Sequence, residues 1–245
     1  MRSFHNKVKS SILQHAVHLS STHHTNTNIH ERWLLDVGVG RGGDMFKWDR
    51  CDIQNVIGFD PDESSINEAN RRYLQSNLIV RNYNFIKCND ICELMQLQPV
   101  TSLMDVVSCQ FAIHYLFSSV ETLTSFVQNV SALLKPGGVF VGTFMDGEQV
   151  IKALNNDKFE FINSATLIYL PKPSLVSNDY GCPLKVHLTG TLFFGENSVS
   201  DEFLVKKEVL TRACESTGLC LVRFKTFKQH HEDLFNEFKM TDDCK

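Results

Sequence analysis

Apolar and polar positions follow two different periods over the first 144 residues of the chain. Short apolar runs are typical of buried strands, and they lie at 33–35, 56–60, 83–88, 104–110 and 139–144. Elsewhere in this region apolar residues recur at helical spacing, which predicts helices at 4–17, 62–74 and 120–134 and a further helix that begins at Met45. A chain in which strands and helices alternate folds into a mostly parallel sheet with right-handed crossovers.

The pattern changes after Asp146. Residues 158–170 and 184–194 are rich in strand-forming residues and are separated by proline and glycine. This composition predicts antiparallel strands that close the edge of the sheet and roof its ligand site. A last helix is expected at 201–216, followed by a final strand at 219–222.

The first predicted strand runs into the glycine-rich turn Asp36-Val37-Gly38-Val39-Gly40-Arg41-Gly42-Gly43-Asp44. Glycines let the backbone turn sharply and let a ligand approach without a Cβ in the way, and the helix start that follows offers unpaired N–H groups. Asp60 ends the second predicted strand, where an acid can accept hydrogen bonds from ribose hydroxyls. The glycine spacing of dinucleotide-binding proteins is not met, so the D-x-G-x-G start favours S-adenosylmethionine. A nucleotide-binding loop or a purely structural loop is the alternative.

Polar and aromatic side chains also follow the third and fourth predicted strands. Asp90 comes just after one strand, and His114 and Tyr115 come shortly after the other. Ligands of open α/β sheets bind at these strand ends, so the three residues are candidates for one pocket. A turn at Asp90 and core packing of the two rings are the alternatives. In the first helix, Asn6 and Lys9 share a face from which a cation can meet a ligand carboxylate, and a solvated helix face is the alternative.

Composition limits the classes of protein that fit. With 245 residues, 42% of them hydrophobic, the chain can bury the core of one large α/β domain. The net charge of −4 argues against sequence-blind nucleic-acid binding but allows a local basic pocket. The eight cysteines contain no C-x-x-C pair, so we expect reduced thiols in apolar segments rather than a zinc site. No membrane span or signal peptide is recognisable, which predicts a soluble, intracellular protein without a membrane partner.

Several stretches together resemble one family, the mRNA cap guanine-N(7) methyltransferases, viral members included. The most specific stretches are the opening helix with Asn6 and Lys9 and the run Gln110-Phe111-Ala112-Ile113-His114-Tyr115. The glycine loop and Leu134-Lys135-Pro136-Gly137-Gly138 are shared by many methyltransferases. The resemblance covers residues 4–144, with a fainter match at Glu202-Phe203-Leu204-Val205.

The resemblance implies an α/β fold of the Rossmann-like class I methyltransferase type. We expect a mostly parallel seven-stranded sheet with helices on both faces and an antiparallel edge or insert in the C-terminal third. A single methyltransferase domain is expected over 1–245. It comprises an N-terminal helix and connector (1–30), a cofactor-binding core (31–145) and a substrate-side lobe that completes the sheet (146–245).

The resemblance also implies residues for two binding sites. Those expected to bind S-adenosylmethionine are Lys9, Asp36, Gly38, Gly40, Asp60, Asp90, Gln110 and Tyr115. Those expected around the cap are His5, Asn6, Arg41, Lys47, Arg72, His114 and Glu202. No metal and no catalytic acid or base is expected, because guanine N(7) already carries a free lone pair at neutral pH. The rate should therefore come from proximity, orientation and electrostatics.

The implied reaction transfers a methyl group from S-adenosylmethionine to guanine N(7) of the mRNA 5′ cap (GpppN-RNA), leaving S-adenosylhomocysteine. The implied partners are the capped mRNA 5′ end and RNA triphosphatase and guanylyltransferase domains of the same polypeptide or complex. The expected location is the cytoplasm, a viral factory or the virion for a viral capping enzyme, and the nucleus for a cellular one. The alternatives are a class I methyltransferase with a small-molecule or protein acceptor, and a non-catalytic scaffold subunit.

The chain departs from the family pattern at three positions of these motifs. His5 stands where the family usually has Asn, Arg41 where it usually has Lys, and Val39 where it usually has Cys. The first two changes keep hydrogen-bond donors but alter their geometry. The family's segment ahead of the opening helix and its late tyrosine-bearing strand have no clear counterpart. We therefore expect either a piece of a longer polypeptide or a cap pocket that is closed differently.

Overall fold

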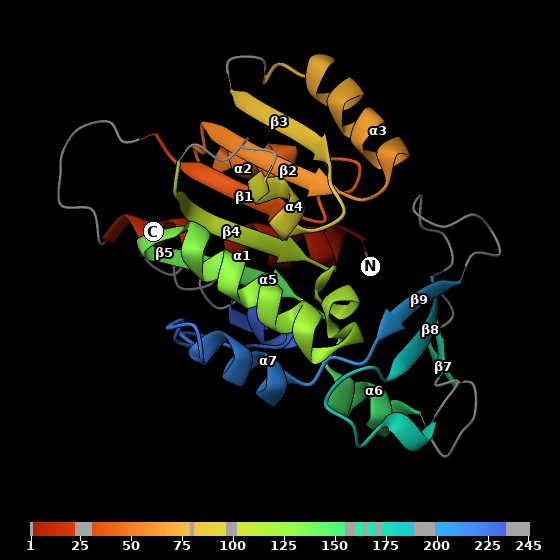
Figure 1. Cartoon of the computed structure of the whole chain (residues 1–245). Helices are drawn as coiled ribbons and strands as arrows, with labels where there is room; N and C mark the ends of the chain where they lie inside the picture. Colours follow the sequence, from red (N-terminus) through yellow and green to blue (C-terminus); the bar gives the residue numbers. More distant parts are fainter. Residues whose placement is uncertain are drawn as a thin grey trace, which may run out of the picture.

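The computed structural model describes residues 2–22, 31–78, 81–96, 102–154, 160–163, 166–169, 173–188 and 199–233 (Figure 1). The helices in these ranges are α1 (Arg2–Thr22), α2 (Met45–Arg50), α3 (Glu63–Leu74), α4 (Ile91–Gln96), α5 (Val120–Leu133), α6 (Gly147–Ala153) and α7 (Lys207–Glu215), with 3-10 helices η1 (Ile113–Ser118) and η2 (Pro173–Leu175). The strands are β1 (Trp33–Val37), β2 (Asn55–Asp60), β3 (Asn82–Lys87), β4 (Met104–Gln110), β5 (Leu134–Thr143), β6 (Glu160–Asn163), β7 (Thr166–Tyr169), β8 (Pro183–Leu188) and β9 (Ser200–Phe203).

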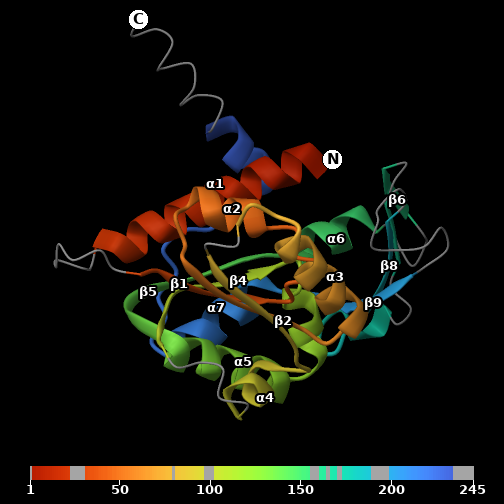
Figure 2. The same cartoon turned by 90° about the horizontal axis from the view of Figure 1, so that it is seen from above.

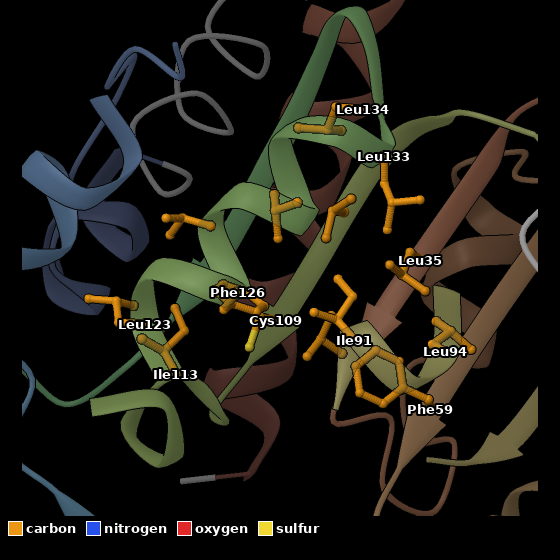
Figure 3. Close-up of a cluster of buried hydrophobic side chains, with 14 of the residues drawn as sticks. Leu35, Phe59, Ile91, Leu94, Cys109, Ile113, Leu123, Phe126, Leu133 and Leu134 are labelled. Carbon is orange, nitrogen blue, oxygen red and sulfur yellow. The ribbon is translucent and has the colours of Figure 1, made fainter. Parts of the chain in front are cut away.

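The main sheet has five parallel strands in the order β3-β2-β1-β4-β5. The central strands β2, β1 and β4 are buried on both faces because helices cover both sides of the sheet, whereas the edge strand β3 alternates exposed and buried residues. Leu34 packs with α1, α2 and α3, whereas its neighbour Leu35 packs with α4, α5 and α7. Figure 2 shows α1 and α2 on one side of the sheet and α4 and α5 on the other. Figure 3 shows the cluster that contains Leu35, with Phe59 next to Ile91 and Phe126 next to Cys109.

A second sheet lies beside the carboxyl ends of the parallel strands (Figure 1). Its order is β6-β7-β8-β9 and all its pairings are antiparallel. Ile168, Leu184 and Val186 bury one face of it in a small core that includes Val150 of α6. The sheet therefore forms its own layer, which carries β9 to the end of β4 and to η1.

The predicted alternation of strands and helices up to residue 144 is confirmed. The predicted N-terminus of α3 is confirmed as well, because the Asp62 carboxylate accepts hydrogen bonds from the backbone N–H groups of Ser64 and Ser65. Among the described residues, no helix is both long enough and apolar enough to cross a membrane.

Three details of the predicted C-terminal third are wrong. Residues 200–203 form β9 rather than the start of a helix, because they pair with residues 183–186 of β8. Residues 219–222 run as irregular chain and not as a strand. The C-terminal strands build a separate sheet, so within the described ranges the main sheet has five strands and not seven. Residues 23–30 of the predicted connector, 189–194 of the predicted strand region 184–194, and 234–245 of the predicted substrate-side lobe lie outside the described residues.

Candidate active site

The glycine loop follows β1 at the carboxyl end of the main sheet. Gly38 has a φ of +75° and Gly40 a φ of +52°, which L side chains rarely adopt. The N–H groups of Gly38 and Val39 both donate to the Phe59 carbonyl at 3.0 Å, which ties the loop to the end of β2. A Cβ on Gly38 would lie 2.7 Å from the Cβ of Ala112. Glycine is therefore required at position 38 for both conformation and space.

Asp60 is held at the end of β2 by backbone donors. One carboxylate oxygen accepts from the Gly40 N–H at 2.9 Å and the other from the Asp62 N–H at 2.9 Å. Burial raises the pKa of Asp60, while these hydrogen bonds oppose that shift. Each oxygen keeps a lone pair, so the carboxylate can accept from a ligand hydroxyl beside the glycine loop.

Asp36 is a buried carboxyl group, only 3% exposed. Its Oδ1 has no hydrogen-bond partner among the described residues. Burial, together with the charge of Asp44, raises the pKa of Asp36 to about 7. A buried polar atom without a partner is costly, so a ligand that brings a cationic donor to this position would be favoured.

Asp44 joins two lysines that come from two different helices on the same side of the sheet. Its Oδ2 lies 2.5 Å from the ammonium of Lys9 in α1, and its Oδ1 lies 2.6 Å from the ammonium of Lys47 in α2. Burial opposes ionisation of Asp44, but the two lysine charges outweigh it and hold its pKa below the usual value. The Lys9 ammonium also lies 5.7 Å from the ring centre of Phe111. Asp44 thus fixes both cations next to the glycine loop.

The end of β4 is pinned to the end of β5. The Thr143 hydroxyl donates to the Gln110 side-chain oxygen at 3.1 Å. The Phe111 N–H donates to the backbone oxygen of Thr143 at 3.0 Å, and Phe111 has a φ of +58°. A phenylalanine in this region is held by its surroundings against its own preference, and here the bonds to Thr143 hold it.

A buried pair of titratable groups lies where β9 meets η1. The Nε2 atom of His114 and the Oε2 atom of Glu202 are 3.6 Å apart, and neither atom has a hydrogen-bond partner among the described residues. Burial lowers the pKa of His114 to about 4 and raises the pKa of Glu202 to about 7. Next to the pair, the Tyr115 hydroxyl lies 3.2 Å from the Ser200 hydroxyl. A ligand that donates hydrogen bonds between them would satisfy both buried atoms.

Arg72 of α3 reaches back to the glycine loop. Its Nη1 donates to the Arg41 carbonyl at 3.0 Å, and its Nε lies 2.7 Å from the Glu68 carboxylate. Arg72 and Arg41 are therefore neighbours, and part of the Arg72 charge is balanced by Glu68. Together with Lys47, which is buried and paired with Asp44, they bring three cationic side chains to the glycine loop.

Comparison with protein families assigns nearly the whole chain. Residues 1–243 match the family model of the mRNA (guanine-N(7))-methyltransferase domain. The chain belongs to this family. The cap methyltransferases of rice and fission yeast, both named mRNA cap guanine-N(7) methyltransferases, are 33% and 32% identical to it over 82% and 98% of the chain. The chain spans 57% and 64% of these two relatives.

Solved structures support the methyltransferase fold alone. An S-adenosylmethionine-dependent methyltransferase from Clostridium acetobutylicum has a TM-score of 0.61 at 14% identity, covering 90% of this chain and 84% of its own. The CcbJ methyltransferase from Streptomyces caelestis also has a TM-score of 0.61, at 16% identity, covering 88% of this chain and 87% of its own. The Rossmann-like class predicted for the methyltransferase domain is confirmed.

Most residues predicted for the two binding sites of the methyltransferase domain come together at the strand ends. His5 packs against Phe111, with ring centres 5.5 Å apart, whereas Asn6 is exposed. Asp90 is exposed and caps α4, because its carboxylate accepts from the Glu93 N–H at 2.8 Å. Its predicted cofactor contact stays a prediction, since a helix cap alone explains this position.

Sequence reasoning missed several residues that shape the site of the methyltransferase domain. Asp44 and Phe111 lay within the motifs already singled out, and their polar or aromatic character was the available signal. Nothing in the sequence marks Ser200 and Thr143 as site residues, because only tertiary packing brings them to Tyr115 and Gln110. In the parts of the chain that the structure describes, no group of three or more His, Cys, Asp or Glu side chains is arranged to hold a metal ion.

Proposed function

We propose that this domain transfers the methyl group of S-adenosylmethionine to N(7) of the guanine in the mRNA 5′ cap. The observation that carries the proposal is the position of β9. It sets the buried Glu202–His114 pair, 3.6 Å apart, beside Tyr115 at the strand ends that also carry the glycine loop. The site therefore has two halves. Membership of the cap methyltransferase family supports S-adenosylmethionine as the ligand of one half and the cap guanine as the ligand of the other.

The first half fits the cofactor. The unpartnered Oδ1 of Asp36 suits the cofactor's ammonium group, and Asp60 suits its ribose. Gly38 leaves no Cβ in the path of the ligand, and Lys9 offers a cation for the carboxylate. The residues that complete this half by family resemblance are Gly40, Asp90, Gln110 and Tyr115. When bound, S-adenosylmethionine supplies a methyl group activated by its sulfonium.

The second half fits a guanine and its phosphates. Glu202 can accept hydrogen bonds from the N–H edge of guanine, and those donors favour the ionised carboxylate. His114 stays neutral at pH 7, because burial lowers its pKa to about 4. The basic side chains Arg41, Lys47 and Arg72 suit the triphosphate bridge. By family resemblance, His5 and Asn6 face the same ligand.

The chain has to orient the two reactants rather than move a proton. Guanine N(7) attacks with its own lone pair, so no side chain acts as general base. Methylation leaves a positive charge on the guanine ring. The ionised Glu202 stabilises this charged ring more than it stabilises the neutral guanine. Misplacing either reactant by about 1 Å costs on the order of a hundredfold in rate.

The proposed partner is the capped 5′ end of mRNA, with RNA triphosphatase and guanylyltransferase domains acting before this step. We propose an intracellular location, in the nucleus or the cytoplasm, wherever these earlier steps occur. The relatives named above are from rice and fission yeast and lend no support to a viral source.

Transfer of labelled methyl from S-adenosylmethionine tests the proposal. GpppA-capped RNA and GTP are offered as acceptors, and nucleoside analysis locates the label. We expect label in 7-methylguanosine for the wild type, its loss in Glu202→Ala, and its retention in Glu148→Ala, which removes a carboxylate 60% exposed on α6. An unlabelled cap, while binding of S-adenosylhomocysteine is normal, would reject the cap as acceptor and favour a different one.

A further inference from the structure

A phenylalanine from the C-terminal part of the chain completes an aromatic cluster beside the site. The ring centre of Phe227 lies 5.3 Å from that of His5, 5.7 Å from that of Phe111 and 6.2 Å from that of Phe4. The cluster joins the first turn of α1, the residue after β4 and the segment after α7. Figure 2 shows this last segment lying against the N-terminal half of α1.

The segment that carries Phe227 is stabilised by local interactions. Residues 227–233 are helical. The Thr226 hydroxyl accepts from the Gln229 N–H at 3.2 Å, and the Gln229 side chain accepts from the Thr226 N–H at 2.8 Å, which makes a reciprocal capping box. An ion pair between Lys225 and Asp233 joins the residue before Thr226 to the end of the same helical segment. The ring of Phe227 is therefore presented from a preformed helical turn and not from a free tail.

Phe227 touches two residues whose positions matter to both substrates. His5 belongs to the proposed cap half, and Phe111 lies under the ammonium of Lys9, which belongs to the cofactor half. The backbone of Phe111 is held in the left-handed region by Thr143. Its ring, in contrast, is held by its neighbours, which among the described residues include the aromatic rings of His5 and Phe227.

We propose that Phe227 is a positioning residue that sets the first turn of α1 and the ring of Phe111, and through them the affinity for both substrates. The inference rests on the proposed function for the identity of the substrates. The ring of Phe227 contacts those of Phe4, His5 and Phe111, so its role is assigned through these neighbours. Its ring acts by keeping Lys9 and His5 in one orientation, so that binding needs no prior ordering of α1.

The test compares Phe227→Ala with Phe224→Ala in the full chain. Phe224 belongs to the same segment, but its ring packs on Phe144 and under Lys207, away from the cluster. For Phe227→Ala, Lys9 and His5 have to be ordered on binding, so we expect KM for S-adenosylmethionine and for GpppA-capped RNA to rise about tenfold to a hundredfold. We expect kcat at saturation to stay within about threefold of wild type. Phe224→Ala should keep both KM values.

Further variants separate positioning from folding. Phe227→Tyr keeps the ring and should restore both KM values, whereas Phe227→Leu keeps apolar volume only and should raise them. Phe227→Leu decides the question if Phe227→Ala does not fold. Unchanged KM values in a folded Phe227→Leu, or equal increases in Phe224→Ala, would overturn the proposal.

A binding measurement distinguishes failure of this inference from failure of the proposed function. The affinity for S-adenosylhomocysteine is measured by titration calorimetry for wild type and variants, with no acceptor present. A wild type that does not methylate capped RNA refutes the proposed acceptor only. Equal affinity of wild type and Phe227→Leu for S-adenosylhomocysteine refutes the positioning role on the cofactor half, whichever acceptor is used.

Discussion

Gly38→Ala should destabilise the protein strongly, because the substitution meets two obstacles at once. The φ of +75° at position 38 costs an L residue about 1–2 kcal/mol. The added Cβ would lie 2.7 Å from the Cβ of Ala112, and overpacking of this kind costs about 1–3 kcal/mol. The sum of about 2–5 kcal/mol is a large part of the roughly 5–15 kcal/mol that stabilises a typical domain.

Thermal unfolding and urea unfolding at pH 7.5 measure the effect. For a chain of this size we expect the midpoint temperature to fall by about 4–20 °C. Gly43→Ala is the matched control in the same loop, because nothing lies within 4 Å of its added Cβ and its φ is not in the left-handed region. It should change the free energy of unfolding by no more than about 0.5 kcal/mol.

Equal midpoints for the two variants would refute this reasoning. That result would mean that the loop moves away from Ala112 at little cost, despite the hydrogen bonds from the N–H groups of Gly38 and Val39 to Phe59. Binding of S-adenosylhomocysteine should follow the same order, with Gly38→Ala weakened and Gly43→Ala close to wild type.

Four further predictions concern charges and caps. Since burial raises the pKa of Glu202 to about 7, kcat/KM for capped RNA should fall about tenfold per pH unit below 7, and Glu202→Gln should show a low and flat profile. The same raised pKa affects stability: the contribution of Glu202 to the free energy of unfolding is fully present below pH 4.5 and is lost as the pH rises to about 7. Over this pH range, urea unfolding should show the free energy of unfolding of Glu202→Gln rising relative to that of wild type by up to about 3 kcal/mol. Asp44→Asn should lose about 3–5 kcal/mol of stability in urea unfolding, because it removes the carboxylate that pairs with two largely buried lysines. Asp62→Ala should lower the midpoint temperature by about 2–4 °C through loss of the cap of α3.

Controls for these predictions come from exposed groups. Asp179→Asn removes a carboxylate that is 46% exposed and paired with Lys206 and Arg212, so it should change stability by less than about 1 kcal/mol. An Asp44→Asn variant as stable as Asp179→Asn would contradict the bridging role of Asp44. A stability difference between wild type and Glu202→Gln that does not vary with pH would contradict the raised pKa.

Local signals in the sequence determined most of the main sheet. The apolar run at 104–110 has the bounds of β4, and Asp62 caps α3 where its position before Glu63 predicts. Strand alternation, helical periodicity and capping hydrogen bonds act over a few residues, so they can be recognised without knowledge of the fold. The glycine loop is of the same kind, because the positive φ at Gly38 is a local requirement of the turn.

Tertiary structure alone decided the conformation of residues 200–206. Their apolar positions fit a helix, but hydrogen bonds to β8 and a bridge between Asp146 and Val205 hold them extended. The partners that make this strand favourable lie far away in sequence, and β preference depends on such neighbours more than helix preference does. The separate second sheet has the same origin.

The contacts that complete the site were also decided by tertiary structure. Glu202 meets His114 only because the second sheet packs beside η1, and Phe227 meets His5 and Phe111 only because the segment after α7 crosses α1. The sequence by itself determined that a parallel sheet presents a glycine loop and acidic strand ends. Which side chains face one another there depends on long-range packing, because contacts between distant residues form only when the layers that carry them come together.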